Sequence, residues 1–438
     1  MFNHIVDFSS WVIIVVFVGN FLRRIIEGYI NCSNDLLLDA DKLVEDLKSA
    51  HPILETEFDE NKFGSLLLYN RIKSIFSYFA SGISTTMGTC FLIIGLSPTI
   101  IEYVCRLDFT VPVGIWSSMV VVALFSSIVM FPFKILSDKI EKKFGYSTMT
   151  NGLMMTDTVK GLLVGMTVNG FVIFAVSVGL DYLGRLNFYT VLYFILGLFL
   201  IVWFLQIMSA YFIMPMFNKF SPLDDGELKS KLTDLATKFN IKLGNVYVMD
   251  GSRRSKKGNA FCLSIPFGPT KLVLFDTLLN ELTVDEIVAV MGHEFAHKIH
   301  RHTLLSYVSM LLKFVILSYV AIFMIYDPYI YHCFGYTYVD ANNINEYTLV
   351  GFMLVGTLLE SVGWIFTPIE SFISRVAEYD ADRTSVRYIG DKESMITSLA
   401  KIYGRSGSVG IVNRSFELWF MSHPSLLHRI NAINSMKV

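Results

Sequence analysis

The sequence predicts a mainly α-helical membrane protein that carries a small cytosolic α+β unit. Three observations predict it: an apolar composition, seven apolar runs, and a polar insert that contains short strand patterns. Of the 438 residues, 53% are hydrophobic and only 17% are charged, and the mean hydropathy is +0.51. This balance is too apolar for an ordinary soluble protein of this length. The net charge of −2 argues against a nucleic-acid partner, which would require a basic patch.

Seven apolar runs predict seven membrane-spanning helices. The first run is followed by the basic pair Arg23-Arg24 and by no small-residue cleavage site, so it indicates a membrane anchor and not a cleaved signal peptide. Each of the six later runs is long enough to cross about 30 Å of hydrocarbon as a helix. The runs lie at 11–22, 75–104, 111–135, 161–180, 188–214, 304–326 and 348–366.

The distribution of basic residues predicts the orientation of these spans. Lys and Arg gather between the third and fourth spans and between the fifth and sixth, whereas the loop at 327–347 contains neither. The positive-inside rule then places the N-terminus in the lumen and the C-terminus in the cytosol, which requires an odd number of spans. The predicted parts are a membrane domain at 1–217 with cytosolic loops at 25–74 and 136–160, a cytosolic insert at 218–302, two spans at 303–370 and a cytosolic segment at 371–438.

The insert at 218–302 predicts one amphipathic helix and a small sheet. The helix follows Pro222, and strands are expected at 246–249, 259–265 and 272–275, separated by basic and Gly/Pro turns. The edge strand of such a sheet can pair with an extended peptide.

Three polar side chains fall inside or at the end of predicted spans: Asn169, Glu360 and Glu370. Such groups usually face a bundle interior or a water-filled cavity, so they favour a hydrated chamber among the helices. Hydrogen bonding between neighbouring helices is the alternative.

One segment contains the motif H-E-x-x-H as His293, Glu294 and His297. Two His residues four positions apart lie on one face of a helix, where both imidazoles can bind one zinc ion. Glu294 can then act as the base for a water activated by the metal. Thr283 and Glu286 have the pattern of a capping box that starts the helix. An apolar stripe lies opposite the motif: Val284, Val288, Met291, Phe295 and Ile299.

A catalytic zinc site takes three protein ligands, and the third is not supplied next to the motif. His300 and Thr303 occupy the positions that hold Gly and His in a metzincin, which excludes that class. His300 and His302 are expected to cap the helix or to lie at an interface. Glu378 is the best distant candidate, because Asp382 lies one turn further along a helix and could hydrogen-bond a ligand His. The spacing alone also fits a solvated ion-pair face. The other open candidates are Glu360, Glu370, Glu393 and His423.

Seven short segments, spread over nearly the whole chain, carry a resemblance to a known family. They are Phe131-Pro-Phe, Glu141-Lys-Lys-Phe-Gly-Tyr-Ser147, 215–223, 273–279, Gly292-His-Glu-Phe-Ala-His297 with His302, Glu378-Tyr-Asp-Ala-Asp382, and Ser422-His-Pro424 with Arg429. They resemble the CAAX prenyl protease 1 family, integral-membrane zinc proteases of the a-factor-converting and prelamin-processing type. Several segments lie far from the zinc motif, which makes the resemblance specific.

The resemblance implies a seven-helix transmembrane barrel enclosing a chamber, with a cytosolic zincin-like α+β metalloprotease domain. It implies one Zn2+ ion per chain, bound by His293, His297 and Glu378, with Glu294 as the base.

The resemblance also implies roles around the substrate. It implies His423 as a donor to the tetrahedral intermediate, Arg429 as a residue that orients His423 or the substrate, and Asn259-Ala260 on the substrate-binding strand. The chain departs from the family at 256–258, Lys-Lys-Gly, where members often carry His-Ser before the Asn.

The implied function is removal of the last three residues from prenylated CAAX proteins, with those proteins or peptides and the lipid bilayer as partners. A second, upstream cleavage is open by family analogy. The implied location is the endoplasmic reticulum and inner nuclear membrane, with the catalytic domain facing the cytosol. The alternatives are a broader quality-control protease for membrane or translocon-stalled chains, and a scaffold that does not cut. The intact H-E-x-x-H motif with Glu378 weighs against the scaffold.

Overall fold

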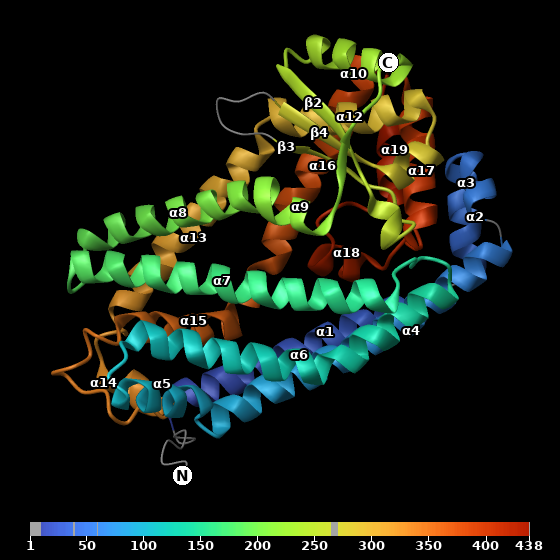
Figure 1. Ribbon diagram of the computed structural model, residues 1–438. Coiled ribbons are helices and arrows are strands. Elements are labelled where there is room, and N and C mark those ends of the chain that lie inside the picture. Colours follow the sequence, from blue (N-terminus) through green and yellow to red (C-terminus); the bar gives the residue numbers. More distant parts are fainter. Residues whose placement is uncertain (1–9, 38–39, 59, 264–269, 438) are drawn as a thin grey trace.

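The computed structural model describes residues 10–437 except 38–39, 59 and 264–269. Long helices fill one part of the molecule, and a small sheet with shorter helices lies at the other (Figure 1). The chain is mainly helical with one small sheet, as the sequence predicts. The long helices are α1 (Trp11–Leu37), α4 (Glu60–Ile93), α6 (Val111–Lys143), α7 (Asn151–Leu183), α8 (Thr190–Met208), α13 (His302–Ile322), α15 (Thr348–Gly363) and α16 (Thr367–Ile389).

Shorter helices connect the long ones or surround the sheet. They are α2 (Ala40–Ala50), α3 (Ile53–Glu57), α5 (Leu96–Arg106), α9 (Met214–Phe217), α10 (Glu227–Lys238), α11 (Asp276–Glu281), α12 (Val284–Ile299), α14 (Pro328–Cys333), α17 (Lys392–Ser406), α18 (Arg414–Phe420) and α19 (Leu426–Asn434).

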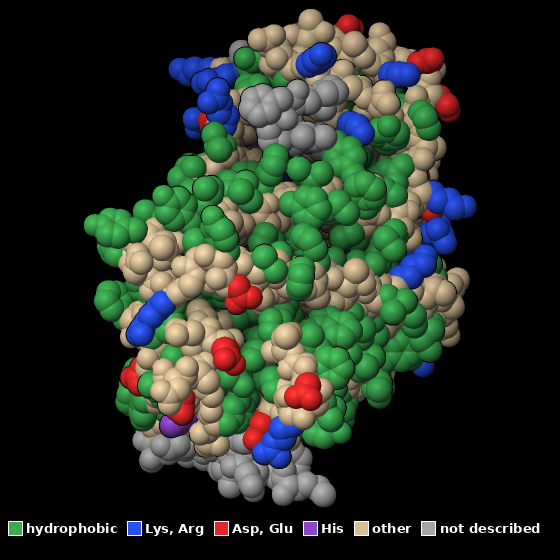
Figure 2. Space-filling model, turned by 60° about the vertical axis from the view of Figure 1, so that its left-hand side comes forward, with side chains coloured by type: hydrophobic (Ala, Val, Ile, Leu, Met, Phe, Trp, Pro, Cys, Tyr) green, Lys and Arg blue, Asp and Glu red, His purple; other side chains and the backbone are tan. Residues whose placement is uncertain are grey.

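Five helical segments of the described chain are long and apolar enough to cross a membrane. Each overlaps one of the predicted spans. Hydrophobic side chains cover a broad band across the middle of the face in Figure 2, where hydrocarbon can contact them. The segments are Val111–Lys143, Asn151–Leu183, Thr190–Phe217, His302–Ile322 and Thr348–Ile389.

The predicted span at 75–104 is broken in the structure. Helices α4 and α5 are bent by 50° and count as a sixth span only when they are taken together. Gly95 lies at the break with a φ of +60°, a left-handed conformation that glycine adopts without steric cost. The predicted first span forms the start of α1, where Arg23, Arg24 and Glu27 follow the apolar run. It is not among the five, so the count of seven stays a prediction.

A four-stranded sheet in the order β1-β2-β4-β3 supports the soluble unit. β2 and β4 are parallel, whereas β1 and β3 pair antiparallel with them, so β3 is an edge strand. The three predicted strands are present, although 264–265 of the second lies outside the described residues. β1 has three residues including Pro222, too few for an alternating pattern to predict. The strands are β1 (Phe220–Pro222), β2 (Leu243–Met249), β3 (Ala260–Leu263) and β4 (Thr270–Phe275).

The two ends of the chain share one apolar core. Leu47 and Phe58, which lie between α1 and α4, are buried with Leu399 of α17 and Ile430 of α19. The segment at 25–74 therefore packs on the C-terminal segment and is more than a connecting loop. A separate core joins the sheet to α10 and α12.

Candidate metal centre

Helix α12 is fixed at its start and along one face. Thr283 Oγ1 accepts a hydrogen bond from Glu286 N, and the Glu286 carboxylate accepts one from Thr283 N, which confirms the predicted capping box. Met291 and Phe295 of the predicted apolar stripe are fully buried in the sheet core. The motif face of α12 is left to meet α16.

The structure brings Glu378 to the motif. One ligand atom from each of His293, His297 and Glu378 lies within 4.8 Å of the others, and no second such trio occurs in the described part of the chain. Glu378 Oε2 is 3.4 Å from His293 Nε2, and Glu378 Oε1 is 3.3 Å from His297 Nε2. The two Nε2 atoms are 3.0 Å apart. Three potential ligand atoms therefore converge on one point.

Helix α16 approaches α12 closely because residue 292 is glycine. A Cβ at Gly292 would lie 2.6 Å from Ser385 Oγ and 2.7 Å from Ile389 Cδ1. Ser385 Oγ donates a hydrogen bond to Ala289 O at 2.8 Å, which ties the two helices together. The glycine beside the first His thus permits the approach that delivers Glu378.

Asp382 orients the ring of His293, as its spacing from Glu378 predicts. Its Oδ1 lies 2.8 Å from His293 Nδ1. Because a carboxylate can only accept, Nδ1 carries a proton, and Nε2, which faces Glu378, is the nitrogen left to bind a metal. Arg429 donates to both oxygens of Asp382, from Nη2 at 2.6 Å and from Nε at 2.8 Å. These two hydrogen bonds of Arg429 therefore lie behind His293.

His297 is oriented by a pair that the sequence did not reveal. His297 Nδ1 lies 2.9 Å from His302 Nδ1, and His302 Nε2 lies 3.5 Å from Asp380 Oδ2. His300 approaches the same oxygen, with its Nδ1 at 3.4 Å. The sequence offered one sign of this arrangement: Asp380 lies two residues after Glu378, on the helix that faces the motif.

The residues present fit a divalent cation. Glu378 Oε2 is buried, and its described neighbours include two imidazole nitrogens, His423 Nδ1 at 2.8 Å and His293 Nε2 at 3.4 Å. Burial disfavours protonation of His293, but the Asp382 and Glu378 carboxylates outweigh it and raise the pKa of His293 to about 9. The cluster therefore favours positive charge where the ligand atoms converge. Two imidazoles and one carboxylate form a donor set that suits catalytic zinc.

Glu294 and His423 lie beside this cluster. Burial raises the pKa of Glu294, while nearby His side chains oppose the rise. The His423 side chain is 56% exposed, whereas that of Glu378 is 5% exposed, so His423 reaches the cluster from its open side. Arg429 is buried, and its Nη1 is 3.8 Å from Glu378 Oε2.

Asn259 and Ala260 lie where β3 begins, at the edge of the sheet. Ala260 N donates to Asn259 Oδ1 at 2.9 Å, and Phe275 N donates to Asn259 O at 3.0 Å. Helix α12 packs against β3, so this edge runs next to the helix that carries Glu294. The backbone of an edge strand can pair with an extended peptide.

Three of the other candidate ligands lie apart from the cluster, whereas His423 lies beside it, 2.8 Å from Glu378. Glu370 pairs with Lys313, and Glu393 Oε2 is 3.0 Å from His51 Nε2. Glu360 is exposed on α15. Of the four candidate carboxylates, Glu378 is the one that lies with His293 and His297 in the described chain.

Comparisons with known proteins cover both parts of the chain. Family models described as "Peptidase family M48" and "CAAX prenyl protease N-terminal, five membrane helices" match residues 222–437 and 42–219. CAAX prenyl protease 1 of Saccharomyces cerevisiae is 30% identical over 410 residues, which span 87% of this chain and 88% of that protein. The CAAX prenyl protease 1 homolog of Homo sapiens is 27% identical, over 88% and 89% of the two chains. A crystal structure of S. mikatae Ste24p matches with a TM-score of 0.82 and 26% identity, covering 97% of this chain and 99% of that one.

Proposed function

The chain belongs to the CAAX prenyl protease 1 family of M48 peptidases, and on that premise we propose that it is a zinc-dependent membrane endopeptidase that removes the aaX tripeptide from prenylated CAAX proteins. The observation that carries this proposal is the convergence of His293, His297 and Glu378 beside Glu294 and the edge strand β3.

His293, His297 and Glu378 would hold one zinc ion. Bound zinc supplies Lewis acidity, which polarises the scissile carbonyl and makes a water easier to deprotonate. Glu294 takes the proton of the attacking water and returns it to the leaving amine. Its raised pKa suits this exchange, because the carboxylate can accept a proton and also release it.

The remaining site residues position these groups and the substrate. Asp382 holds His293 in the tautomer that binds metal, and Arg429 neutralises the buried carboxylate. His423 donates a hydrogen bond to the oxyanion of the tetrahedral intermediate from the open side of the site. The Asn259-Ala260 edge pairs with the backbone of the aaX tail.

The membrane domain explains how a lipidated substrate reaches the site. α12 ends at Ile299 and the apolar helix α13 begins at His302, so the metal site is close to the end of a spanning helix. A prenyl group contributes about 0.8 kcal/mol for each buried CH2, which holds the modified tail at the bilayer. We infer seven spans around a chamber, with the catalytic unit in the cytosol and the protein in the endoplasmic reticulum and inner nuclear membrane.

Cleavage of a farnesylated CAAX peptide by purified full-length protein in liposomes tests the proposal. Mass spectrometry should find the cut between the modified Cys and the next residue. Glu294→Gln should lose most of the turnover while elemental analysis finds wild-type zinc content, because Glu294 is not a ligand. Near wild-type proteolysis by this variant would refute the mechanism, and a cut at scattered positions would favour the quality-control protease.

A further inference from the structure

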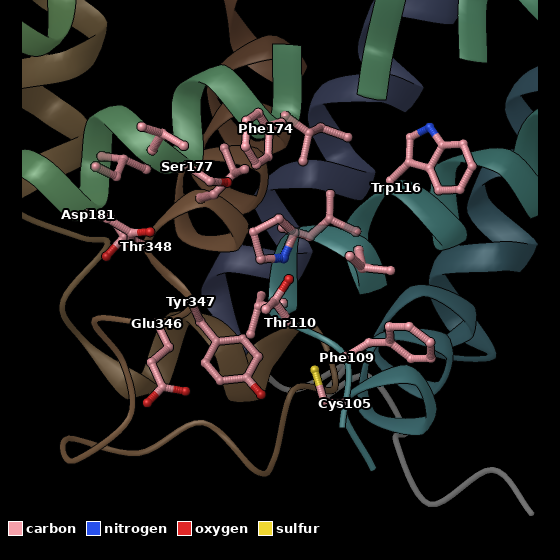
Figure 3. A pocket seen from close by; sticks show the side chains of 18 of the residues that line it. Cys105, Phe109, Thr110, Trp116, Phe174, Ser177, Asp181, Glu346, Tyr347 and Thr348 are labelled. Atoms are coloured by element: carbon pink, nitrogen blue, oxygen red, sulfur yellow. The ribbon is translucent and has the colours of Figure 1, made fainter. Parts of the chain in front are cut away.

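A cavity of about 740 Å3 lies between α6, α7 and the start of α15, apart from the metal centre (Figure 3). Its volume is within the ~300–1,000 Å3 range of small-molecule sites. Its lining comes from 105–116 on one side, 170–181 on the second and 345–349 on the third. The positive-inside orientation places this end of the helices in the lumenal leaflet.

The two ends of the cavity differ in chemistry. Figure 3 shows Asp181 and Glu346 on one side of the view, with Glu346 below Asp181, and Trp116 and Phe109 on the other, with Phe174 above the middle. The acidic end lies at the C-terminal end of α7 and in the loop before α15. Phe109 lies just before α6, whereas Trp116 of α6 and Phe174 of α7 lie further along their helices, towards the bilayer interior. This arrangement matches a molecule that has one polar head and one apolar tail.

Ser177 is a buried polar residue in the lining of the cavity. The residue is 8% exposed, and its Oγ has no hydrogen-bond partner among the residues that the structure describes. It lines the cavity one helical turn before Asp181, on the same face of α7. A buried hydroxyl without a partner is uncommon and costly, so a polar group entering from the acidic end would satisfy it.

The charges of the lining residues indicate which polar head group the cavity can bind. Neither Asp181 nor Glu346 forms an ion pair with any residue that the structure describes, and the described lining contains no Lys, Arg or His. A phosphate would meet two carboxylates and no cation, so an ordinary phospholipid is disfavoured. A protonated amine would instead meet carboxylate acceptors, with which it forms charge-assisted hydrogen bonds.

We propose that this cavity binds a single-chain lipid amine of the lumenal leaflet. The amine lies beside Asp181 and Glu346, the polar groups next to it reach Ser177 Oγ, and the alkyl chain follows the apolar wall towards Trp116. The proposal is independent of the proteolytic function, because none of these residues belongs to the metal centre.

Three probes with one alkyl chain and different heads test the proposal: octadecylamine, octadecanol and octadecanoic acid. Purified full-length protein in dodecyl maltoside is titrated with each, and the rise in its unfolding temperature gives an apparent affinity. We expect octadecylamine to bind at least about tenfold more tightly than octadecanol, and the acid to bind most weakly. Lysophosphatidylethanolamine, which adds a phosphate to the amine, should bind more weakly than octadecylamine.

Variants connect the binding to the cavity. Asp181→Asn/Glu346→Gln should remove the preference for the amine, and Ser177→Val should weaken amine binding. Glu346→Gln alone, in an exposed loop, tests the same charge if the double variant does not fold. Asp108→Asn is the matched control, because Asp108 is exposed at the same end and does not line the cavity. Equal binding of amine and alcohol, a preference that survives both charge variants, or stronger binding of the lysophospholipid would overturn the proposal.

Discussion

Asp382→Asn tests how the fold prepares the metal site. The substitution keeps the shape of a side chain that is 2% exposed but replaces one acceptor oxygen with an NH2 group. If the amide oxygen faces His293, the NH2 group meets the Arg429 guanidinium and two donors clash. If the new amide is rotated by half a turn, its NH2 group faces His293 Nδ1. This contact favours the His293 tautomer in which Nε2 carries the proton. Either arrangement opposes metal binding.

The contacts of Asp382 set the expected magnitudes. Losing a partner that orients a metal-binding His lowers metal affinity about 10–100-fold. An uncompensated buried Arg costs about 3–5 kcal/mol, and the lower end applies because Glu378 Oε2 remains 3.8 Å from Arg429 Nη1. Zinc affinity is measured by chelator competition and stability by thermal unfolding of the purified protein.

Two companion variants separate affinity from stability. Asp382→Asn/Arg429→Met removes the buried charge, so stability should recover while zinc affinity stays low. Asp380→Asn should lower zinc affinity less, because Asp380 is 37% exposed and reaches His297 only through His302. Unchanged zinc affinity in Asp382→Asn would refute the reasoning.

Three further outcomes follow from the described contacts. Gly292→Ala should cost about 1–3 kcal/mol of stability and lower the zinc content, because the added Cβ separates α12 from α16. Gly356→Ala is the control and should do neither, because the space at its Cβ is open. Equal shifts of the unfolding temperature in the two variants would contradict this prediction. Glu378→Ala should lose zinc in elemental analysis and Glu370→Ala should keep it, so full occupancy without Glu378 would move the ligand elsewhere. In a background without native cysteines, a Cys at 343 should label from the lumen and one at 408 from the cytosol, and labelling from one side would refute the seven-span count.

The sequence predicts the parts of the site that depend on local spacing. His293 and His297 converge because they lie one turn apart on a single helix, and the capping box that starts this helix is also local. Glu378 lies on a distant helix, so its spacing left other candidates open until the crossing of α12 and α16 selected it.

The sequence patterns could not predict contacts between segments that lie far apart in the chain. The His302–Asp380 support of His297 depends on two helices that meet only in the fold. The packing of the N-terminal helices on α17 and α19 joins segments whose apolar positions show no sign of their partners. The break at Gly95 depends on one residue within an apolar run, where hydropathy continues unchanged.

Comparing a farnesylated CAAX peptide with its unprenylated twin, in the same liposomes, tests the central claim most directly. A farnesyl chain adds burial at about 0.8 kcal/mol for each CH2, and this remote binding energy holds the scissile bond at the metal centre. We predict that kcat/KM for the farnesylated peptide exceeds that of its twin by orders of magnitude. Equal kcat/KM values would contradict the claim and leave the quality-control protease as the better interpretation.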